Sequence, residues 1–400
     1  MKICVGGICA PKGFLASGIH SGIKKRGLDL ALIYSPFLCN VVAFFSKNQI
    51  QAAPNIISKE RVLKNKMACA ILVNSGNANC LVGKKGVSDV KELTALLAKR
   101  LNTEERFILP ASTGIIGKRL PLNRIKMAIP KLINSLSIKG SSSAGKAIMT
   151  TDKIRKEIAV VFGVNKCSIK IGAIAKGAGM ISPSLATMLC FISTDANISY
   201  PALKIASKEA FDVSFNRITV DGQMSTNDMV VILANGLAGN SIILPNTKDF
   251  RLFKMALRYI CEYLAKLIVK DAEGATKFIE ITVKNALTEL EASSIARGVA
   301  NSPLVKTALY GEDPNFGRIL SAIGACPSRF NLNRLKLFIQ GLLVFKNGEI
   351  YYSNLNIVKN RLKKDGINIT IDLGIGKETY RLWTSDLSEE YIRINSAYST

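Results

Sequence analysis

The pair Ala186-Thr187 lies where a polar, glycine-rich segment gives way to the apolar run at residues 188–192. A threonine hydroxyl is a weak nucleophile until a base lies beside it, and the residue's own α-amino group can be that base. The amine is free only if the peptide bond between Ala186 and Thr187 is cut, and its reference pKa of roughly 7.7 to 8.0 suits a general base near neutral pH. On spacing alone, a threonine that merely caps a buried strand is the more ordinary interpretation, and it stays open at this point.

Polar groups also follow other predicted strands. Ser112-Thr113-Gly114 offers two hydroxyls and a backbone amide, donors that could form an oxyanion hole or simply a turn. The small side chains at residues 74–79 would let a ligand approach the backbone, or they form a plain loop. Glu273 is expected in a tight helix-to-strand turn, where its carboxylate could meet a cationic substrate or only solvent.

Histidine and cysteine usage excludes several kinds of site. The chain has one histidine, His20, so a Ser-His-Asp triad or a histidine-rich metal site would depend on it alone. The nine cysteines form no C-x-x-C pair and lie mostly among apolar residues, as reduced core thiols do. We therefore expect no metal site and catalysis by other groups.

The composition indicates a globular protein with a strongly basic surface. The 400 residues are 48% hydrophobic, enough for a large core, and 54 Lys and Arg against 29 Asp and Glu give a net charge of +25. The basic residues are scattered, no nucleic-acid-binding motif accompanies them, and only 7% of residues are aromatic. We expect a solvated basic surface that favours acidic substrates, with no specific nucleic-acid binding. Without a membrane-length apolar run or a signal peptide, a cytoplasmic location is expected.

Strands and helices are predicted to alternate from end to end, which is typical of an α/β or α+β fold with mixed sheets. The helix at 252–269 should bury one apolar stripe, made of Leu252, Met255, Tyr259, Ile260, Tyr263, Leu264 and Leu267. Another helix should begin at a Ser88 cap, and residues 140–145 should form a loop. The remaining predictions are strands at 28–34, 41–45, 68–73, 229–234 and 278–283, helices at 120–136 and 201–213, and hairpins joining 158–163 to 167–175 and 342–345 to 349–352.

Several segments together resemble the bifunctional ornithine acetyltransferase/N-acetylglutamate synthase family of arginine biosynthesis. The likeness runs through the whole chain in the expected order and favours a nucleophilic Thr187. The family usually has histidine where this chain has Ser182, and tryptophan where it has Phe316. The matching segments are GGICAPKGF at 6–14, NSGNAN at 74–79, PASTGIIG at 110–117, MTTD at 149–152, KGAGMISPSLATML at 176–189, TVDGQMSTNDMVVILANG at 219–236, DAEGATKF at 271–278, GEDPNFGR at 311–318 and INSAYST at 394–400.

The resemblance implies that the precursor cleaves itself between Ala186 and Thr187, leaving an α chain of residues 1–186 and a β chain of residues 187–400. Thr187 would then take the acetyl group of N2-acetylornithine and pass it to glutamate. The Thr113 hydroxyl and the Gly114 amide would form the oxyanion hole. The substrate contacts implied by the family are Thr150, Lys176, Thr187, Glu273, Asn395 and Thr400.

The same resemblance implies an αββα-type layered core, an α2β2 heterotetramer and no cofactor, with acetyl-CoA as a candidate second acetyl donor. A lysine such as Lys176 can bind a substrate carboxylate, and Glu273 can bind an ammonium group. Two alternatives remain at this stage: a related self-processing N-terminal-threonine hydrolase or aminopeptidase that passes the acyl group to water, and a basic binding protein in which Thr187 is structural.

Overall fold

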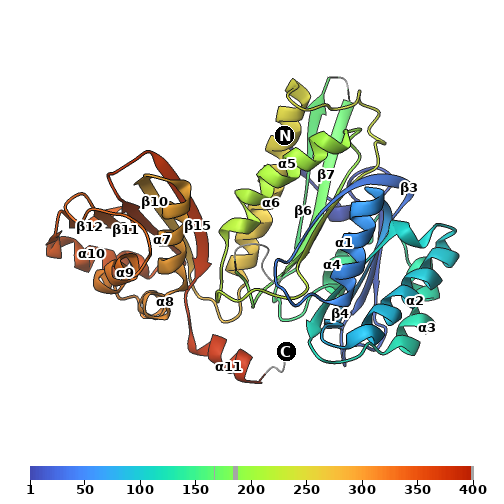
Figure 1. The fold of residues 1–400 in the computed structure, drawn as a ribbon, viewed down its shortest axis with the longest axis horizontal. Helices are drawn as coiled ribbons and strands as arrows, with labels where there is room; N and C mark the ends of the chain where they lie inside the picture. Colours follow the sequence, from blue (N-terminus) through green and yellow to red (C-terminus); the bar gives the residue numbers. More distant parts are fainter. Residues whose placement is uncertain (166, 183–187, 398–400) are drawn as a thin grey trace.

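Two β-sheets, each with its own hydrophobic core, organise the chain in the computed structural model (Figure 1), which describes residues 1–165, 167–182 and 188–397. The larger sheet is built from residues that precede 235, and the smaller sheet from residues that follow 277. The long helix α6 (Lys248–Lys270) lies between them in sequence.

The larger sheet has nine strands among the described residues and mixes parallel with antiparallel pairs. Its strands run in the order β1, β6, β7, β8, β9, β3, β4, β5, and β2 pairs with β3. Their bounds are β1 Lys2–Cys4, β2 Leu15–Ile19, β3 Leu30–Phe45, β4 Met67–Asn77, β5 Ile108–Ile115, β6 Lys156–Val164, β7 Cys167–Lys176, β8 Leu189–Thr194 and β9 Met229–Ala234.

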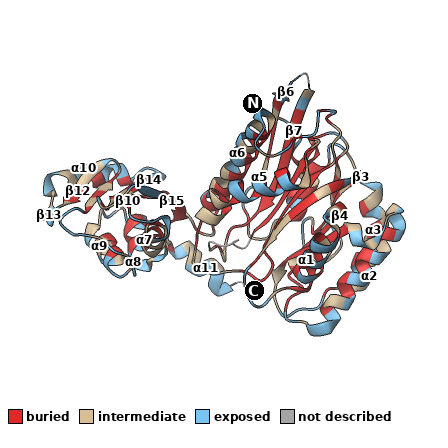
Figure 2. Ribbon diagram, turned by 45° about the horizontal axis from the view of Figure 1, so that its top comes forward, coloured by how far each residue is buried: buried red, intermediate tan, exposed pale blue. Residues whose placement is uncertain are grey.

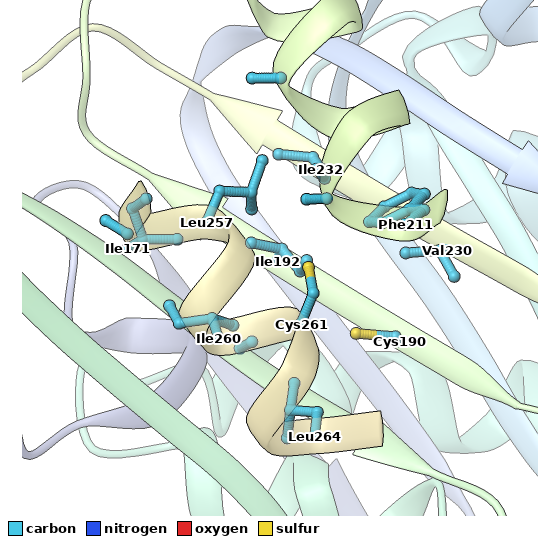
Figure 3. Packing of buried hydrophobic residues seen from close by; sticks show 14 of the residues in the cluster. Ile171, Cys190, Ile192, Phe211, Val230, Ile232, Leu257, Ile260, Cys261 and Leu264 are labelled. Atoms are coloured by element: carbon cyan, nitrogen blue, oxygen red, sulfur yellow. The ribbon is translucent and has the colours of Figure 1, made fainter. Parts of the chain in front are cut away.

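Alternate side chains of β8 and β9 enter two different cores, because successive residues of a strand point to opposite faces. Cys190 and Ile192 pack against α6 and α5 (Tyr200–Asp212), and Figure 3 shows them near Leu257, Ile260 and Cys261 of α6. Leu189 and Phe191 point the other way, into a core shared with β2, β3, β4 and α4 (Ser141–Ala147).

A third core covers the outer side of β3–β5 with two further helices, α2 (Gly83–Leu101) and α3 (Leu122–Asn134). Helix α1 (Ala53–Asn65) packs beside β5 and α2. The order of layers is therefore helices, strands, strands, helices, as the sequence resemblance implies, and Figure 2 shows the buried residues concentrated in the strands. The short 3-10 helices are η1 Gly7–Cys9, η2 Glu105–Phe107 and η3 Phe215–Arg217.

The smaller sheet orders its strands β13, β12, β11, β14, β10, β15 and buries one face under helices. The predicted hairpin at Asn347-Gly348 joins β12 to β13, and both turn residues have the positive φ (53° and 88°) that such a turn requires. The elements are β10 Phe278–Ala286, β11 Lys336–Ile339, β12 Leu342–Lys346, β13 Glu349–Ile350, β14 Gly366–Asp372, β15 Glu378–Ser385, α7 Glu289–Asn301, α8 Pro303–Tyr310, α9 Phe316–Gly324 and α10 Tyr352–Leu362.

The last described element is α11 (Glu389–Ala397), which has no buried residue. In Figure 1 it leaves the smaller sheet and runs beneath the space between the two sheets. Its position depends on polar contacts, which are described with the site below.

Two sequence predictions about loops and caps are wrong. Residues 140–145 are not a loop, since α4 begins at Ser141, and a Cβ on Gly140 would lie 1.7 Å from the Ala16 carbonyl oxygen. The small side chains at residues 140–145 allow α4 to approach β2 closely. Ser88 is not a cap, because α2 begins at Gly83, where the Asn79 side chain donates to the Gly86 carbonyl at 3.1 Å.

Two predictions about apolar segments also need correction. The strands predicted at 28–34 and 41–45 are parts of one strand, β3, which begins at Leu30 and pairs irregularly with β4 between Tyr34 and Cys39. In α6, Met255, Tyr259 and Tyr263 are partly or largely exposed, while Phe253, Leu257 and Cys261 are buried. Ile260 and Leu264 of the predicted stripe are buried, so the spacing predicts the helix but only part of the side that is covered.

Candidate active site

A pocket lies at the ends of β5 and β7, and six of the residues implied by the resemblance line it: Thr113, Gly114, Thr150, Lys176, Glu273 and Asn395. They come from the strand ends, the segment after α4, the turn after α6 and helix α11. Residues far apart in sequence thus surround one space. Ala186, Thr187 and Thr400 lie outside the described residues, so their positions stay predictions.

Thr113 and Gly114 occupy the end of β5 beside Ser75 and Gly76 of β4. Gly114 has φ +129°, and a Cβ there would come within 2.4 Å of the Gly76 backbone, so only glycine fits. Thr113 is 4% exposed, and its hydroxyl makes no hydrogen bond to the other described residues. A hydroxyl and a backbone amide in neighbouring positions can stabilise a developing oxyanion.

Asn227, which sequence reasoning did not assign to the site, fixes this strand end. Its side-chain amide donates to the carbonyls of Ala78 (2.7 Å) and Ser112 (2.9 Å), and its own oxygen accepts from the Thr226 hydroxyl (2.6 Å). The loop before β9 is thereby joined to β4 and β5. Its place in the segment matched at 219–236 is the signal that could have identified it.

Lys176 is the last residue of β7 and is 3% exposed. Its Nζ lies 3.8 Å from Asp152 Oδ2. Burial lowers the pKa of Lys176, and the Asp152 carboxylate partly offsets this. The site therefore holds a poorly hydrated cation that can bind a substrate carboxylate.

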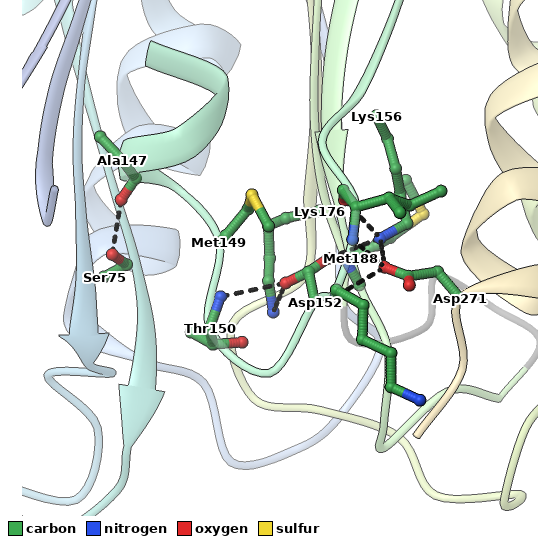
Figure 4. A network of polar contacts seen from close by, with 12 residues as sticks. Ser75, Ala147, Met149, Thr150, Asp152, Lys156, Lys176, Met188 and Asp271 are labelled. Atoms are coloured by element: carbon green, nitrogen blue, oxygen red, sulfur yellow. Dashed lines mark hydrogen bonds and ion pairs between the residues drawn. The ribbon is translucent and has the colours of Figure 1, made fainter. Parts of the chain in front are cut away.

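Asp152 belongs to a network of buried charges behind Lys176 (Figure 4). Lys156 donates to Asp152 Oδ1 at 2.8 Å and also pairs with Asp271. The backbone amides of Thr150 (3.0 Å) and Gly177 (2.7 Å) donate to the Asp152 carboxylate. Burial alone would raise the pKa of Asp152, but the two lysines and the Gly177 amide hold it below its usual value.

A further, partly buried cation, Lys24, supports the segment that carries Thr150. Its Nζ donates to the carbonyls of Met149 (2.6 Å) and Leu28 (2.9 Å). Burial lowers the pKa of Lys24 to about 8, with Asp29 opposing that effect. Sequence reasoning did not identify Lys24, since a lysine in a basic chain gives no signal of burial.

The pocket is also lined by acidic side chains, Glu273 and Asp221. Glu273 follows α6, its amide donates to the Ala178 carbonyl at 2.9 Å, and its Oε2 accepts from the Asn395 side chain at 2.9 Å. A Cβ on Gly179 would lie 2.3 Å from Glu273 Oε2, so this glycine leaves room for the carboxylate. A carboxylate here can receive a substrate ammonium group.

Asp221 and Tyr391 were also missed. The carboxylate of Asp221 accepts the amides of Met180 (2.6 Å) and Ile181 (2.9 Å), and the Tyr391 hydroxyl donates to it at 3.2 Å. Burial and the neighbouring Asp221 raise the pKa of Tyr391. Together with Asn395, Tyr391 anchors the otherwise exposed helix α11 at the pocket.

His20, the lone histidine, is exposed, does not line this pocket and contacts Asp29. Within the described ranges no three His, Cys, Asp or Glu side chains gather as a metal site would need. No helix in those ranges is long and apolar enough to cross a bilayer.

Comparison with known proteins gives consistent matches. The ArgJ family model matches residues 15–400. The arginine biosynthesis bifunctional protein ArgJ of Caldanaerobacter subterraneus subsp. tengcongensis is 43% identical over the whole of both chains, and that of Oceanobacillus iheyensis is 42% identical over 99% of this chain and 97% of its own. A crystal structure of the Bacillus halodurans protein of the same name matches with a TM-score of 0.50 and 42% identity, covering 52% of this chain and 98% of that one.

Proposed function

We propose that this chain, which belongs to the ArgJ family and is therefore an enzyme of arginine biosynthesis, transfers the acetyl group of N2-acetylornithine to glutamate through an acetyl-threonine at Thr187. The family membership rests on the family model, which matches residues 15–400, and on a relative that matches over the full length of this chain. The chemical course is the one that the sequence resemblance implies, and the charged side chains that line the pocket support it. Because the related proteins are named bifunctional, acetyl-CoA is included as a second candidate donor, with no bound cofactor.

The observation that carries the proposal is the arrangement of charge around one pocket. Lys176 and Glu273 both line it, together with Thr113 and Gly114 at the strand end. An N-acetylated diamino acid carries a carboxylate and an ammonium, which these two side chains complement. Thr150 and Asn395 line the same space and can complete the contacts to the substrate.

The reaction has two halves. In the first, the Thr187 hydroxyl attacks the acetyl carbonyl while the α-amine takes its proton, and ornithine leaves. In the second, the amine of glutamate attacks the acetyl-threonine and N-acetylglutamate leaves. The Thr113 hydroxyl and the Gly114 amide would stabilise the oxyanion in both halves.

Self-cleavage between Ala186 and Thr187 would divide the chain between β7 and β8, which are hydrogen-bonded neighbours from Ile171–Thr194 to Lys176–Leu189. The α chain (1–186) and the β chain (187–400) would therefore share one sheet and its cores. We therefore expect the two chains to remain strongly associated after cleavage. The solved relative that spans 52% of this chain is close in length to one such product.

Assembly into an α2β2 heterotetramer and a cytoplasmic location are further parts of the proposal. Sedimentation of the purified enzyme should give the mass of two α and two β chains. A mass of one α and one β chain would contradict the tetramer.

Mass spectrometry tests the mechanism. The purified protein should give two chains, the second beginning at Thr187, and incubation with acetylornithine alone should add one acetyl group to that second chain. Thr187→Ala should remain one chain and gain no acetyl group. A wild-type protein that stays intact would contradict the nucleophile assignment, and release of acetate in place of N-acetylglutamate would favour the hydrolase alternative.

A further inference from the structure

The backbone after β7 connects the two charged side chains that the proposed function assigns to the substrate. Lys176 is the last residue of β7, and the Glu273 amide donates to the carbonyl of Ala178, two residues further along the chain, at 2.9 Å. Burial lowers the pKa of Lys176, and Glu273 is among the carboxylates that oppose this effect, so the two charges lie near each other. The backbone that carries the anion is thus bonded directly to the segment that carries the cation.

The Glu273 carboxylate rests on Gly179, which also lines the pocket. A Cβ on this glycine would lie 2.3 Å from Oε2, 2.5 Å from Cδ and 2.8 Å from Oε1, so its three nearest atoms are all those of the carboxylate. Oε2 accepts from the Asn395 side chain, whereas Oε1 accepts no hydrogen bond from the described residues. Oε1 can therefore receive a substrate ammonium group, at a position that the α-carbon of Gly179 limits on one side.

The backbone conformation at Gly179 does not itself require glycine. Its φ lies outside the left-handed region, whereas Gly114 at the end of β5 has φ +129°. A larger residue could adopt the Gly179 conformation without strain. The close approach of the Glu273 carboxylate is therefore the reason for a residue without a side chain at this position.

The substrate has its ammonium group at the end of its side chain, because the acetyl group occupies the α-nitrogen. The number of methylenes then fixes how far the ammonium lies from the carboxylate that Lys176 would bind. We propose that Gly179 determines the length of the diamino acid that the enzyme accepts, an inference that rests on the proposed function. Gly179 does so through Glu273, whose carboxylate could not occupy its present position beside a side chain.

A methyl group on residue 179 would shorten the available space. The carboxylate of Glu273 would have to move by about 1 Å, since ordinary contacts begin at 3.4 Å and this one would be 2.3 Å. Protein interiors leave few voids, so the open space beside it is the pocket that both residues line. The methyl group and the displaced carboxylate would both take up room there, which favours a diamino acid one methylene shorter.

Gly179→Ala tests this role with N2-acetyl-2,4-diaminobutyrate, N2-acetylornithine and N2-acetyllysine, which increase in length by one methylene each. Glutamate is the acceptor, and rates are taken per mole of cleaved enzyme. In Gly179→Ala, kcat/KM for acetylornithine should fall relative to that for acetyldiaminobutyrate by about 10- to 200-fold, the discrimination that one methylene gives in an enzyme pocket. An unchanged ratio, equal losses on all three substrates, or a shift toward acetyllysine would overturn the proposal.

Gly163→Ala is the matched control. Gly163 lies in β6, and its φ is also outside the left-handed region, but a Cβ there would have no atom within 4 Å. This variant should keep the wild-type ratio of the three kcat/KM values. The control therefore separates the loss of a glycine from the displacement of a carboxylate.

Glu273→Asp tests whether Gly179 acts through this acid. The shorter side chain withdraws its carboxylate from residue 179, so Gly179→Ala should change the substrate ratio little when it is added to Glu273→Asp. Contacting residues give such non-additive effects, whereas independent ones give additive effects. The same shift in both backgrounds would overturn the proposal.

A measurement on the wild type covers the case in which Gly179→Ala does not fold. Because the position of Glu273 is fixed, the wild type should favour acetylornithine over both the shorter and the longer substrate by about 10-fold or more. Equal kcat/KM values for the three would overturn the inference. A wild type that transfers an acetyl group from none of them would instead overturn the proposed function, so the two failures differ.

Discussion

At the scale of single residues, Thr113 offers the most direct measurement of the oxyanion site. Its hydroxyl lines the pocket and makes no hydrogen bond to the other described residues, so its removal should cost little stability. Thr113→Ala should lower kcat for acetyl transfer by about 100- to 1000-fold, the loss typical of one oxyanion donor. Thr113→Ser, which keeps the hydroxyl, should retain most of the activity. Equal kcat values for the two variants would exclude the hydroxyl as a donor.

Lys176 should set the alkaline limit of activity. Because burial lowers its pKa, its ammonium loses its proton earlier than an ordinary lysine as pH rises, and the substrate carboxylate loses its partner. Asp152→Asn removes the anion that favours the charged lysine, so the alkaline limb of kcat/KM should move to lower pH. The profile of each enzyme between pH 6 and 10 gives the comparison, and an unchanged limb would show that another group titrates.

At the scale of elements, Lys156 joins three segments: its own strand β6, the turn at Asp152 and the end of α6 at Asp271. Both ion pairs are almost fully buried. Lys156→Met would leave two buried carboxylates without this partner and should lower the free energy of unfolding by about 3–5 kcal/mol. Urea unfolding measures this loss.

Lys208→Met is the matched control for that experiment. Its pair with Asp212 is exposed and screened by solvent, so little change is expected. Similar losses in both variants would mean that the buried network contributes nothing special to the position of Asp152 and, through it, of Lys176.

At the scale of the whole molecule, the net charge of +25 should favour the anionic substrate over the neutral one. Glutamate carries one net negative charge at pH 7, whereas acetylornithine carries none. Since salt screens charge beyond a distance of about 10 Å at 0.1 M, KM for glutamate should rise with ionic strength while KM for acetylornithine changes much less. If the two KM values change in parallel, the effect of salt does not come from the net charge of the protein.

The sequence alone determined the alternation of strands and helices, the two hairpins, and the segments whose order carries the family resemblance. Those features depend on short stretches of sequence or on the order of segments along the chain. A strand end, the turn with positive φ at Asn347-Gly348 and an apolar period each lie within one short stretch. It also placed Thr113, Gly114, Thr150, Lys176, Glu273 and Asn395 in one functional group before any geometry was known.

Only the tertiary structure decided which side of α6 is covered, why residues 140–145 are helical, and what supports the site. The partners of Asp152 and Asn227 are distant in sequence: the Gly177 amide and the Ser112 carbonyl respectively. A buried aspartate and an exposed one read the same in a sequence, because burial and pairing depend on which segments meet. The meeting of these segments buries Lys176 and thereby lowers its pKa.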